Sequence, residues 1–311
     1  MKAICGYNKY AMANAKLIRR QPAMASQRKF SSMLSSDRYS QQRGRGTQFS
    51  EEKLIDNGDL ALGEIPEILK YEHEHQETTI SNGIRVMTET SPSEVAAVGV
   101  FIGAGSRHEK MENSGEAHFL EHLHFKGSSR RSRYGLETEV ENRGNQLNAY
   151  TSREFTLYHM LSFKSDVAHS VDVLGDMLCN SVYEHFHVEV EKDTIWQELQ
   201  ATNNDHFETL MENVYFNVYR EHMMGLPILG EIENIHKITR QMIVEFHQRM
   251  YFGENMVIVG TGSIEHNQLV DLAEQHFGKL QRTNGGQAIL NLDKPEFNPG
   301  LLYVRDDQMP Q

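Results

Sequence analysis

Alternation between apolar and polar residues predicts a sheet in the middle of the chain. Residues 78–80 and 84–88 flank the turn sequence Ser81-Asn82-Gly83, which is typical of a hairpin. Residues 95–102 are almost continuously apolar, and this run is too short to cross a bilayer, so it predicts a buried strand. Residues 146–150 and 155–163 are expected to form a second hairpin, and further strands are expected over residues 256–260 and 301–305.

Apolar residues spaced three and four apart predict helices between these strands. Val167, Val171, Leu174 and Leu178 share one face of such a helix, and Gly144 ends another over residues 136–142. Other helices are expected over residues 117–126, 188–223, 242–250 and 268–277. Because strands and helices do not alternate strictly, the pattern predicts an α+β fold, a mixed β-sheet layered with α-helices.

Charge divides the chain into a basic leader and an acidic body. Residues 1–36 hold seven Lys or Arg and no Asp or Glu, whereas the formal total is −12, which leaves −19 on residues 37–311. A basic, acid-free leader is typical of a mitochondrial transit peptide, and Arg28 precedes the junction Phe30-Ser31 as in a matrix cleavage site. A disordered basic tail is the alternative. The acidic body argues against nucleic acid as a partner and suits a cationic peptide.

Composition also indicates the cellular compartment of the protein and the boundaries of its segments. No apolar run is long enough for a transmembrane segment. If Cys5 is removed with the leader, Cys179 is the one thiol left, which favours a reducing compartment such as the mitochondrial matrix. The predicted segments are a leader (1–36), a lead-in (37–75), a main domain (76–280), a linker (281–299) and the start of a second domain (300–311).

The segment Ala117-His118-Phe119-Leu120-Glu121-His122 carries the predicted chemistry. On a helix, His118 and His122 lie one turn apart and can bind one metal ion, with Glu121 beside it but not a ligand. This is the His-x-x-Glu-His pattern of inverzincins. A peptidase zinc ion needs a third protein ligand, and the best candidate is Glu198; Glu191 lies two helical turns earlier and can support a ligand.

The metal motif alone is only moderately specific, because a chain with 16 His and many Glu meets it by chance in roughly one case in fifteen. The residues around the motif make its assignment as a metal site more specific. Four blocks in order resemble the pitrilysin/insulinase family of zinc metallopeptidases: residues 98–107, 115–127, 147–154 and 230–235. Glu198 follows His122 by 76 residues, the family's spacing for the distal ligand. Gly103 and Glu116 depart from the family's usual residues without removing a ligand.

The resemblance implies one Zn²⁺ per chain, held by His118, His122 and Glu198, and a zinc-bound water activated by Glu121. It also implies an endopeptidase that removes basic presequences from proteins imported into mitochondria, in a heterodimer with a glycine-rich, non-catalytic α subunit. Substrate is expected to add as a strand along Asn148-Ala149-Tyr150. On the residues alone, that segment is an ordinary hairpin arm.

The resemblance further places Glu208 and Glu212 where family members bind a substrate Arg near the cut. The alternative is that both are simply exposed helical acids. Family subunits have two similar halves, and this sequence ends just inside the second, so we expect a pitrilysin-type half with a truncated second half.

Two alternatives to an active peptidase remain. One is a non-catalytic core subunit of the respiratory cytochrome bc complex, and the other is a truncated, inactive product. The complete set of His118, Glu121, His122 and Glu198 favours the enzyme, because the core subunits usually have degraded metal motifs.

Overall fold

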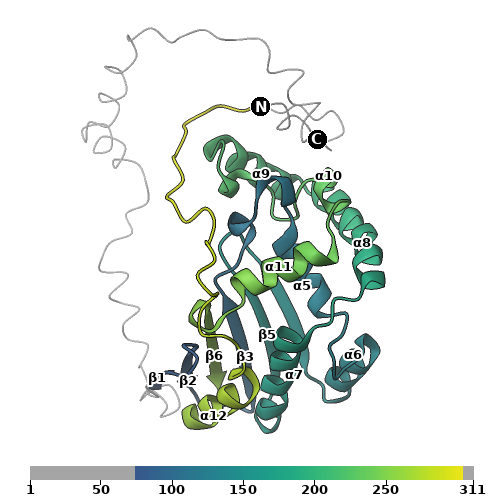
Figure 1. Ribbon diagram of the computed structural model, residues 1–311. Helices are drawn as coiled ribbons and strands as arrows, with labels where there is room; N and C mark the ends of the chain where they lie inside the picture. The colour runs from purple at the N-terminus through teal and green to yellow at the C-terminus, as the bar shows by residue number, and fades with distance from the viewer. Residues whose placement is uncertain (1–73, 304–311) are drawn as a thin grey trace, which may run out of the picture. The chain divides into compact units, whose positions relative to one another are not determined.

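The computed structural model describes residues 74–303, which are coloured in Figure 1. The predicted leader, nearly all of the predicted lead-in and residues 304–311 lie outside this range. The described residues form a six-stranded mixed sheet with the order β1-β2-β6-β3-β5-β4. Its strands are β1 (Glu74–Thr79), β2 (Arg85–Thr90), β3 (Val95–Ile102), β4 (Gln146–Thr151), β5 (Thr156–Phe163) and β6 (Met256–Gly262).

The strands expected between residues 78 and 260 all form, and the predicted α+β class is confirmed. Both expected hairpins are present as the antiparallel pairs β1–β2 and β4–β5. Strand β6 returns from far along the chain and lies between β2 and β3, parallel to β2 and antiparallel to β3. Strand β4 therefore ends the sheet, with one edge paired to β5 and the other open.

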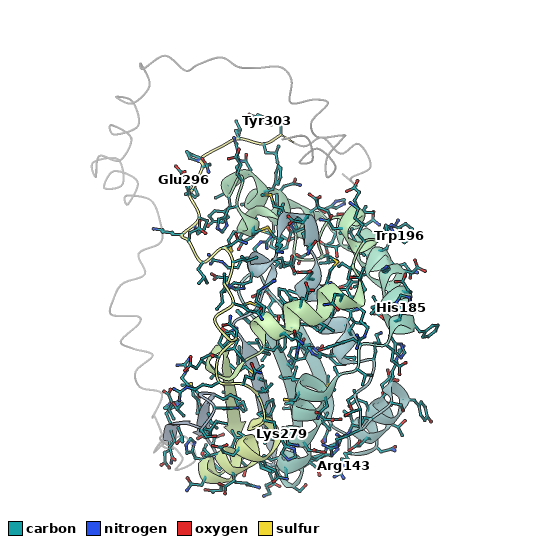
Figure 2. The ribbon with its side chains drawn as sticks, in the orientation of Figure 1. Arg143, His185, Trp196, Lys279, Glu296 and Tyr303 are labelled. Atoms are coloured by element: carbon teal, nitrogen blue, oxygen red, sulfur yellow. The ribbon has the colours of Figure 1, made fainter. Side chains whose placement is uncertain are left out.

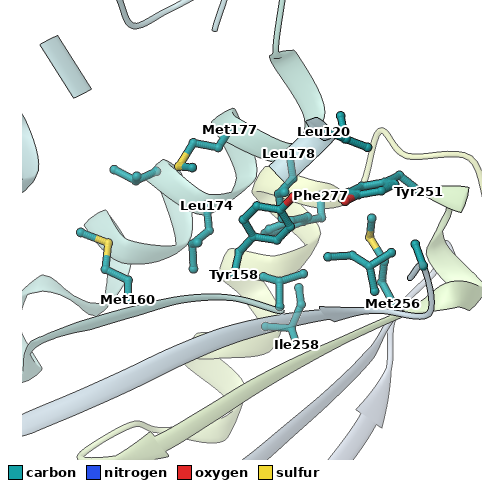
Figure 3. Close-up of a cluster of buried hydrophobic side chains, with 14 of the residues drawn as sticks. Leu120, Tyr158, Met160, Leu174, Met177, Leu178, Tyr251, Met256, Ile258 and Phe277 are labelled. Carbon is teal, nitrogen blue, oxygen red and sulfur yellow. Dashed lines mark hydrogen bonds between the residues drawn. The ribbon is translucent and has the colours of Figure 1, made fainter. Parts of the chain in front are cut away.

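Helices cover one face of this sheet. Helices α7 (Val167–Asn180) and α12 (His266–Phe277) pack on each other and on the central strands (Figure 1). Their apolar side chains meet those of the strands in a core where Met160 and Ile258 face Leu174 and Phe277 (Figure 3). The other helices are α5 (Glu116–His124), α6 (Arg133–Asn142), α8 (His185–Asn204), α9 (His206–Val218), α10 (Ile232–Ile235) and α11 (Arg240–Met250).

The prediction of one continuous helix over residues 188–223 was wrong, although most of this stretch is helical. The chain forms α8 and α9 instead, followed by a 3₁₀ turn, η7, at Met223–Gly225. Asp205 leaves the helical conformation, with φ −84° and ψ 113°, and its carboxylate accepts hydrogen bonds from the N–H groups of Phe207 and Glu208. Asp205 therefore caps the start of α9. The helical spacing of apolar residues continues on both sides of it, although the backbone helix is interrupted there.

The C-terminal part of the described chain has little regular structure. Residues 281–299, the predicted linker, contain no helix or strand. Residues 301–303 are not in a strand either, so the strand expected over 301–305 is not seen in its described part. Cys179 is a free thiol, and Cys5 lies outside the described residues. No helix within residues 74–303 combines the length and the apolar character that crossing a membrane requires.

Candidate metal centre

Helix α5 carries the metal motif, and its start is fixed by a buried carboxylate. Glu109 is fully buried and accepts hydrogen bonds from the N–H groups of Gly115 (2.8 Å) and Ala117 (2.7 Å), two of the free donors at the helix N-terminus. Gly115 has φ +101°, and a Cβ there would lie 2.8 Å from the carbonyl oxygen of Leu229. The chain therefore enters α5 in a conformation that only glycine adopts without strain.

The structure brings His118, His122 and Glu198 together. The two rings lie on one face of α5, with centroids 4.6 Å apart. Glu198 reaches them from α8: its Oε1 is 3.6 Å from His118 Nε2, and its Oε2 is 3.2 Å from His122 Nε2. One ligand atom from each of the three residues lies within 4.8 Å of the others.

This arrangement fits a zinc ion by spacing and by donor chemistry. Atoms bound tetrahedrally to zinc at about 2.0–2.1 Å lie about 3.3 Å apart. The separations of 3.6 Å and 3.2 Å from the Glu198 oxygens to the two Nε2 atoms are close to that spacing. Two imidazoles and one carboxylate are a donor set that zinc prefers and that leaves a fourth position open.

Glu191 holds the far side of His122. Its Oε1 is 2.8 Å from His122 Nδ1, and its Oε2 accepts a 2.7 Å hydrogen bond from Lys126 Nζ. Both Glu191 and Lys126 are largely buried, so the carboxylate is fixed between two partners. This contact orients the ring and leaves Nε2 facing Glu198, the usual way in which a second residue prepares a metal ligand.

Burial and hydrogen bonding change the pKa values in opposite directions here. Burial lowers the pKa of His122, but hydrogen bonds with Glu191 and Glu198 outweigh burial and raise it to about 9. The hydrogen bonds from His118 and His122 hold the pKa of Glu198 well below its ordinary value. Burial raises the pKa of Glu191, yet His122 and Lys126 lower it overall. The two glutamates are thus kept as carboxylates.

Glu121 is partly buried on the same helix and has a partner from the sheet. Thr151, at the end of β4, donates a short hydrogen bond from Oγ1 to Glu121 Oε2. Helix α5 packs beside β4, and the hydrogen bond with Thr151 places the Glu121 carboxylate against the end of this strand. Sequence analysis missed Thr151, because no local spacing links a strand residue to a helix 30 residues earlier.

The residues predicted to bind substrate occupy two places. Asn148, Ala149 and Tyr150 lie on the edge strand β4, where Tyr150 is 55% exposed and the Ala149 N–H donates to Asn148 Oδ1 at 2.8 Å. Glu208 and Glu212 lie on α9. Glu208 is exposed, whereas Glu212 is partly buried and pairs with Arg153 at 2.7 Å.

A buried polar cluster lies beneath the metal helix. His124, two residues after His122, contacts the hydroxyl of Tyr158 through Nδ1 (2.7 Å) and that of Tyr183 through Nε2 (2.9 Å). Tyr158 also contacts the Tyr251 hydroxyl at 3.2 Å, and Figure 3 shows these two rings among the apolar side chains of the core. Burial lowers the pKa of His124, so a neutral histidine joins α5 to the sheet. His124 lies in the block 115–127 that resembles the family, but the sequence gave no sign of these partners.

Two family models match the chain. The model described as insulinase (peptidase family M16) matches residues 85–232, and the model described as peptidase M16 inactive domain matches residues 237–311. The region of the second model includes β6, which lies between β2 and β3, so residues from both matched regions build the same sheet.

Curated relatives and solved structures agree with these matches. The mitochondrial-processing peptidase subunit beta of Neurospora crassa is 41% identical over 238 residues, covering 76% of this chain and 50% of the relative. The human protein of the same name is 36% identical, covering 86% and 53%. A protease from Helicobacter pylori aligns with a TM-score of 0.65 at 25% identity, covering 72% of this chain and 54% of that one. The chain spans about half the length of the curated relatives that it matches.

Proposed function

Because the chain belongs to the insulinase family of peptidases, family M16, we propose that it is a zinc-dependent endopeptidase subunit that removes basic presequences. The observation that carries this proposal is the convergence of His118, His122 and Glu198 beside Glu121. The names of the relatives, mitochondrial-processing peptidase subunit beta, support a peptidase that acts in mitochondria, and basic presequences are the substrate class that the family resemblance implies.

His118, His122 and Glu198 would hold the zinc ion through two Nε2 atoms and a carboxylate. A zinc ion in such a site acts as a Lewis acid that lowers the pKa of water toward about 7 and polarises a carbonyl. Glu121 accepts the proton of the attacking water and passes it to the leaving amine, acting as general base and then as general acid. Thr151 orients the Glu121 carboxylate during both transfers.

Substrate would add as an extra strand along the open edge of β4, over Asn148, Ala149 and Tyr150. The Ala149 N–H that now donates to Asn148 Oδ1 would donate to the substrate instead. Strand addition suits presequences of different sequence, because the main chain supplies most of the hydrogen bonds. The charge of −19 on residues 37–311 attracts basic peptides to this edge.

A glycine-rich, non-catalytic α subunit is the proposed partner, and the mitochondrial matrix is the proposed compartment. The relatives' printed name, which describes a β subunit of a mitochondrial enzyme, supports a heterodimer and a mitochondrial location. The nature of the α subunit and the matrix compartment are what the family resemblance implies. The intact donor set disfavours a purely structural core subunit of a respiratory complex, which has no need of two imidazoles and a carboxylate around one point.

Metal analysis combined with a cleavage assay tests the proposal. The substrate is a peptide with the sequence of residues 16–36, which holds Arg28 and the Phe30-Ser31 junction, assayed with and without a candidate α subunit. Glu121→Gln should keep about one zinc ion per chain and lose cleavage, whereas His118→Ala should lose both. Wild-type protein that binds no zinc and leaves the peptide intact with the α subunit present would support the structural role instead.

A further inference from the structure

His124 occupies a buried position just beyond the metal motif. It is the last residue of α5, two positions after His122, and it is fully buried. Both of its ring nitrogens have a partner: Nδ1 lies 2.7 Å from the hydroxyl of Tyr158 on β5, and Nε2 lies 2.9 Å from the hydroxyl of Tyr183. A neutral imidazole donates at one nitrogen and accepts at the other. The sheet thus orients the ring, and the ring in turn holds Tyr183.

Tyr183 lies in the loop between α7 and α8 and has a strained backbone. Its φ is +47°, a left-handed value that a bulky residue adopts only when its surroundings hold it there. Arg240, the first residue of α11, donates from Nε to the Tyr183 carbonyl at 2.9 Å and from Nη2 to the Val182 carbonyl at 3.3 Å. The hydrogen bond to His124 holds the other end of the residue. Tyr183 is therefore fixed by α11 through its main chain and by α5 through its hydroxyl.

Helix α8, which carries Glu198 and Glu191, begins two residues after Tyr183. Among the described residues, no side chain caps the N-terminus of this helix, whereas Asp205 caps α9. The turn at Tyr183 therefore sets the direction in which the chain enters α8. Packing gives limited help, because only four of the twenty residues of α8 are buried: Val188, Glu191, Ile195 and Leu199.

The length of α8 turns a small change at its start into a large change at the metal site. Glu198 stands thirteen residues after His185, the first residue of the helix, which is about 20 Å along the axis. Figure 2 labels His185 and Trp196, and they lie at separate points along this helix. A tilt of about 3° at the start would move the Glu198 carboxylate by about 1 Å. Zinc ligands keep their distances within about 0.2 Å, so the site requires the helix axis to be fixed.

One further polar contact joins α8 to α5, nearer the middle of α8. Glu191 is buried, and its Oε1 lies 2.8 Å from His122 Nδ1. A single contact leaves a helix free to swing about that point, and the apolar packing of Ile195 and Leu199 is not directional. The hydrogen bond between His124 and Tyr183 supplies a second fixed point at the start of the helix. The two contacts together define the axis along which Glu198 approaches the imidazoles.

We propose that His124 and Tyr183 are positioning residues, which tie the start of α8 to α5 and thereby place Glu198 opposite the two imidazoles. The inference rests on the proposed function for its metal ion, whereas the tie between the two helices does not. Because residues two apart point to nearly opposite sides of a helix, α5 presents His122 to the ion and His124 to the segment that places the remaining ligand.

Two phenylalanine variants test the tie. Tyr183→Phe removes the hydroxyl at Nε2 of His124, and Tyr158→Phe removes the hydroxyl at Nδ1, so each deletes one hydrogen bond to the same buried ring. Tyr183→Phe should lower the affinity for Zn²⁺ about 10-fold in competition with a chelator, whereas Tyr158→Phe should lower it less than about twofold. Equal affinities in the two variants would show that the cluster supports only the core, and would overturn the inference.

A double-mutant cycle on zinc affinity tests the route of the effect. His124→Leu should lower the affinity by a factor similar to that of Tyr183→Phe, and the two changes together should cause no further loss, because the hydrogen bond is already absent. A full additional loss from Tyr183→Phe in the His124→Leu background would mean that the hydroxyl acts through another partner, and would contradict the role of His124.

Hydrogen exchange of the zinc-free full chain tests the tie without the metal ion. Tyr183→Phe should quicken exchange over residues 188–198 of α8, and Tyr158→Phe should not. Equal exchange in α8 for the two variants would overturn the inference, whether or not the wild type binds zinc. Wild-type protein that binds no zinc would instead overturn the proposed function, so the two failures are distinguishable.

Discussion

At the residue scale, Thr151 donates a hydrogen bond to Glu121, the carboxylate proposed to move the protons. Thr151→Val removes the hydroxyl but keeps a branched side chain, so we expect kcat to fall about tenfold while KM changes little, because Glu121 loses the contact that orients it. Steady-state kinetics with the presequence peptide measure this effect. Thr151→Ser should restore kcat, and zinc content should stay constant in both variants. An unchanged kcat in Thr151→Val would show that the hydroxyl has no part in catalysis.

Lys126 is linked to the proposed metal ligand His122 through one intermediate residue, Glu191. Lys126→Met leaves Glu191 with a single partner, His122, and a less firmly fixed carboxylate. Loss of such support commonly lowers metal affinity about 10- to 100-fold, and we expect a change of that size in competition with a chelator. Lys192→Met is the control, because Lys192 pairs with the half-exposed Glu189 on α8. Equal affinities in the two variants would contradict the role assigned to Lys126.

At the element scale, α9 depends on its cap more than on packing. None of the residues of α9 is buried, so the helix gains little from the core. Asp205→Ala removes the acceptor for the N–H groups of Phe207 and Glu208, the second and third residues of the helix, and should cost about 1 kcal/mol of local stability. Hydrogen exchange should quicken in residues 207–218 and not in α7. Asp193→Ala, an exposed change within α8, should leave exchange in α9 as it is; unchanged exchange in Asp205→Ala would mean that other contacts hold the helix.

The elements that could be predicted are those whose pattern is local. Strand β3 begins and ends where its apolar run does, and α5 holds His118, Glu121 and His122 at helical spacing. The break between α8 and α9 was missed because Asp205 interrupts the backbone while apolar residues continue on both sides. A single capping residue is a weaker signal than a periodic pattern.

At the scale of the whole molecule, the unpredicted features depend on segments that meet only in the folded chain. The parallel pairing of β2 with β6 joins residues about 170 positions apart, and alternation within each strand gives no sign of the partner. The same holds for the site: the spacing on α5 indicated two ligands, whereas Glu198 was a remote candidate that gained its support from the family's spacing. Thr151, Lys126 and Arg153 were not assigned roles, because their partners come from other elements.

A charge network ties several of these elements together. Arg131 pairs with Glu139 on α6 and with Asp172 and Asp176 on α7, with distances between 2.5 and 3.0 Å. Hydrogen bonds from Arg131 and His169 lower the pKa of Glu139 to about 2 despite burial. Burial raises the pKa of Asp172, but Arg130 and Arg131 outweigh it and lower the value to about 2. Arg130, His169 and His276 complete the network.

The stability of the fold should therefore depend on acid pH through this network. The unfolded chain binds protons at the ordinary pKa values of 4.5 for Glu139 and 3.8 for Asp172, while the folded chain resists them until about pH 2. The network thus stabilises the protein fully above about pH 5, and its contribution falls as pH decreases from there to about 2.

Arg131→Met tests this dependence, because it removes the cation that contributes to lowering both pKa values. The Arg131 side chain is only 11% exposed and faces all three acids. Urea unfolding should show a loss of about 3–5 kcal/mol at pH 7 and a much smaller loss near pH 2.5. Arg133→Met, which breaks the half-exposed pair with Glu137, should cost less than about 1 kcal/mol at either pH. A deficit in Arg131→Met that stays constant from pH 7 to pH 2.5 would show that packing of the arginine, and not its charge, holds these elements together.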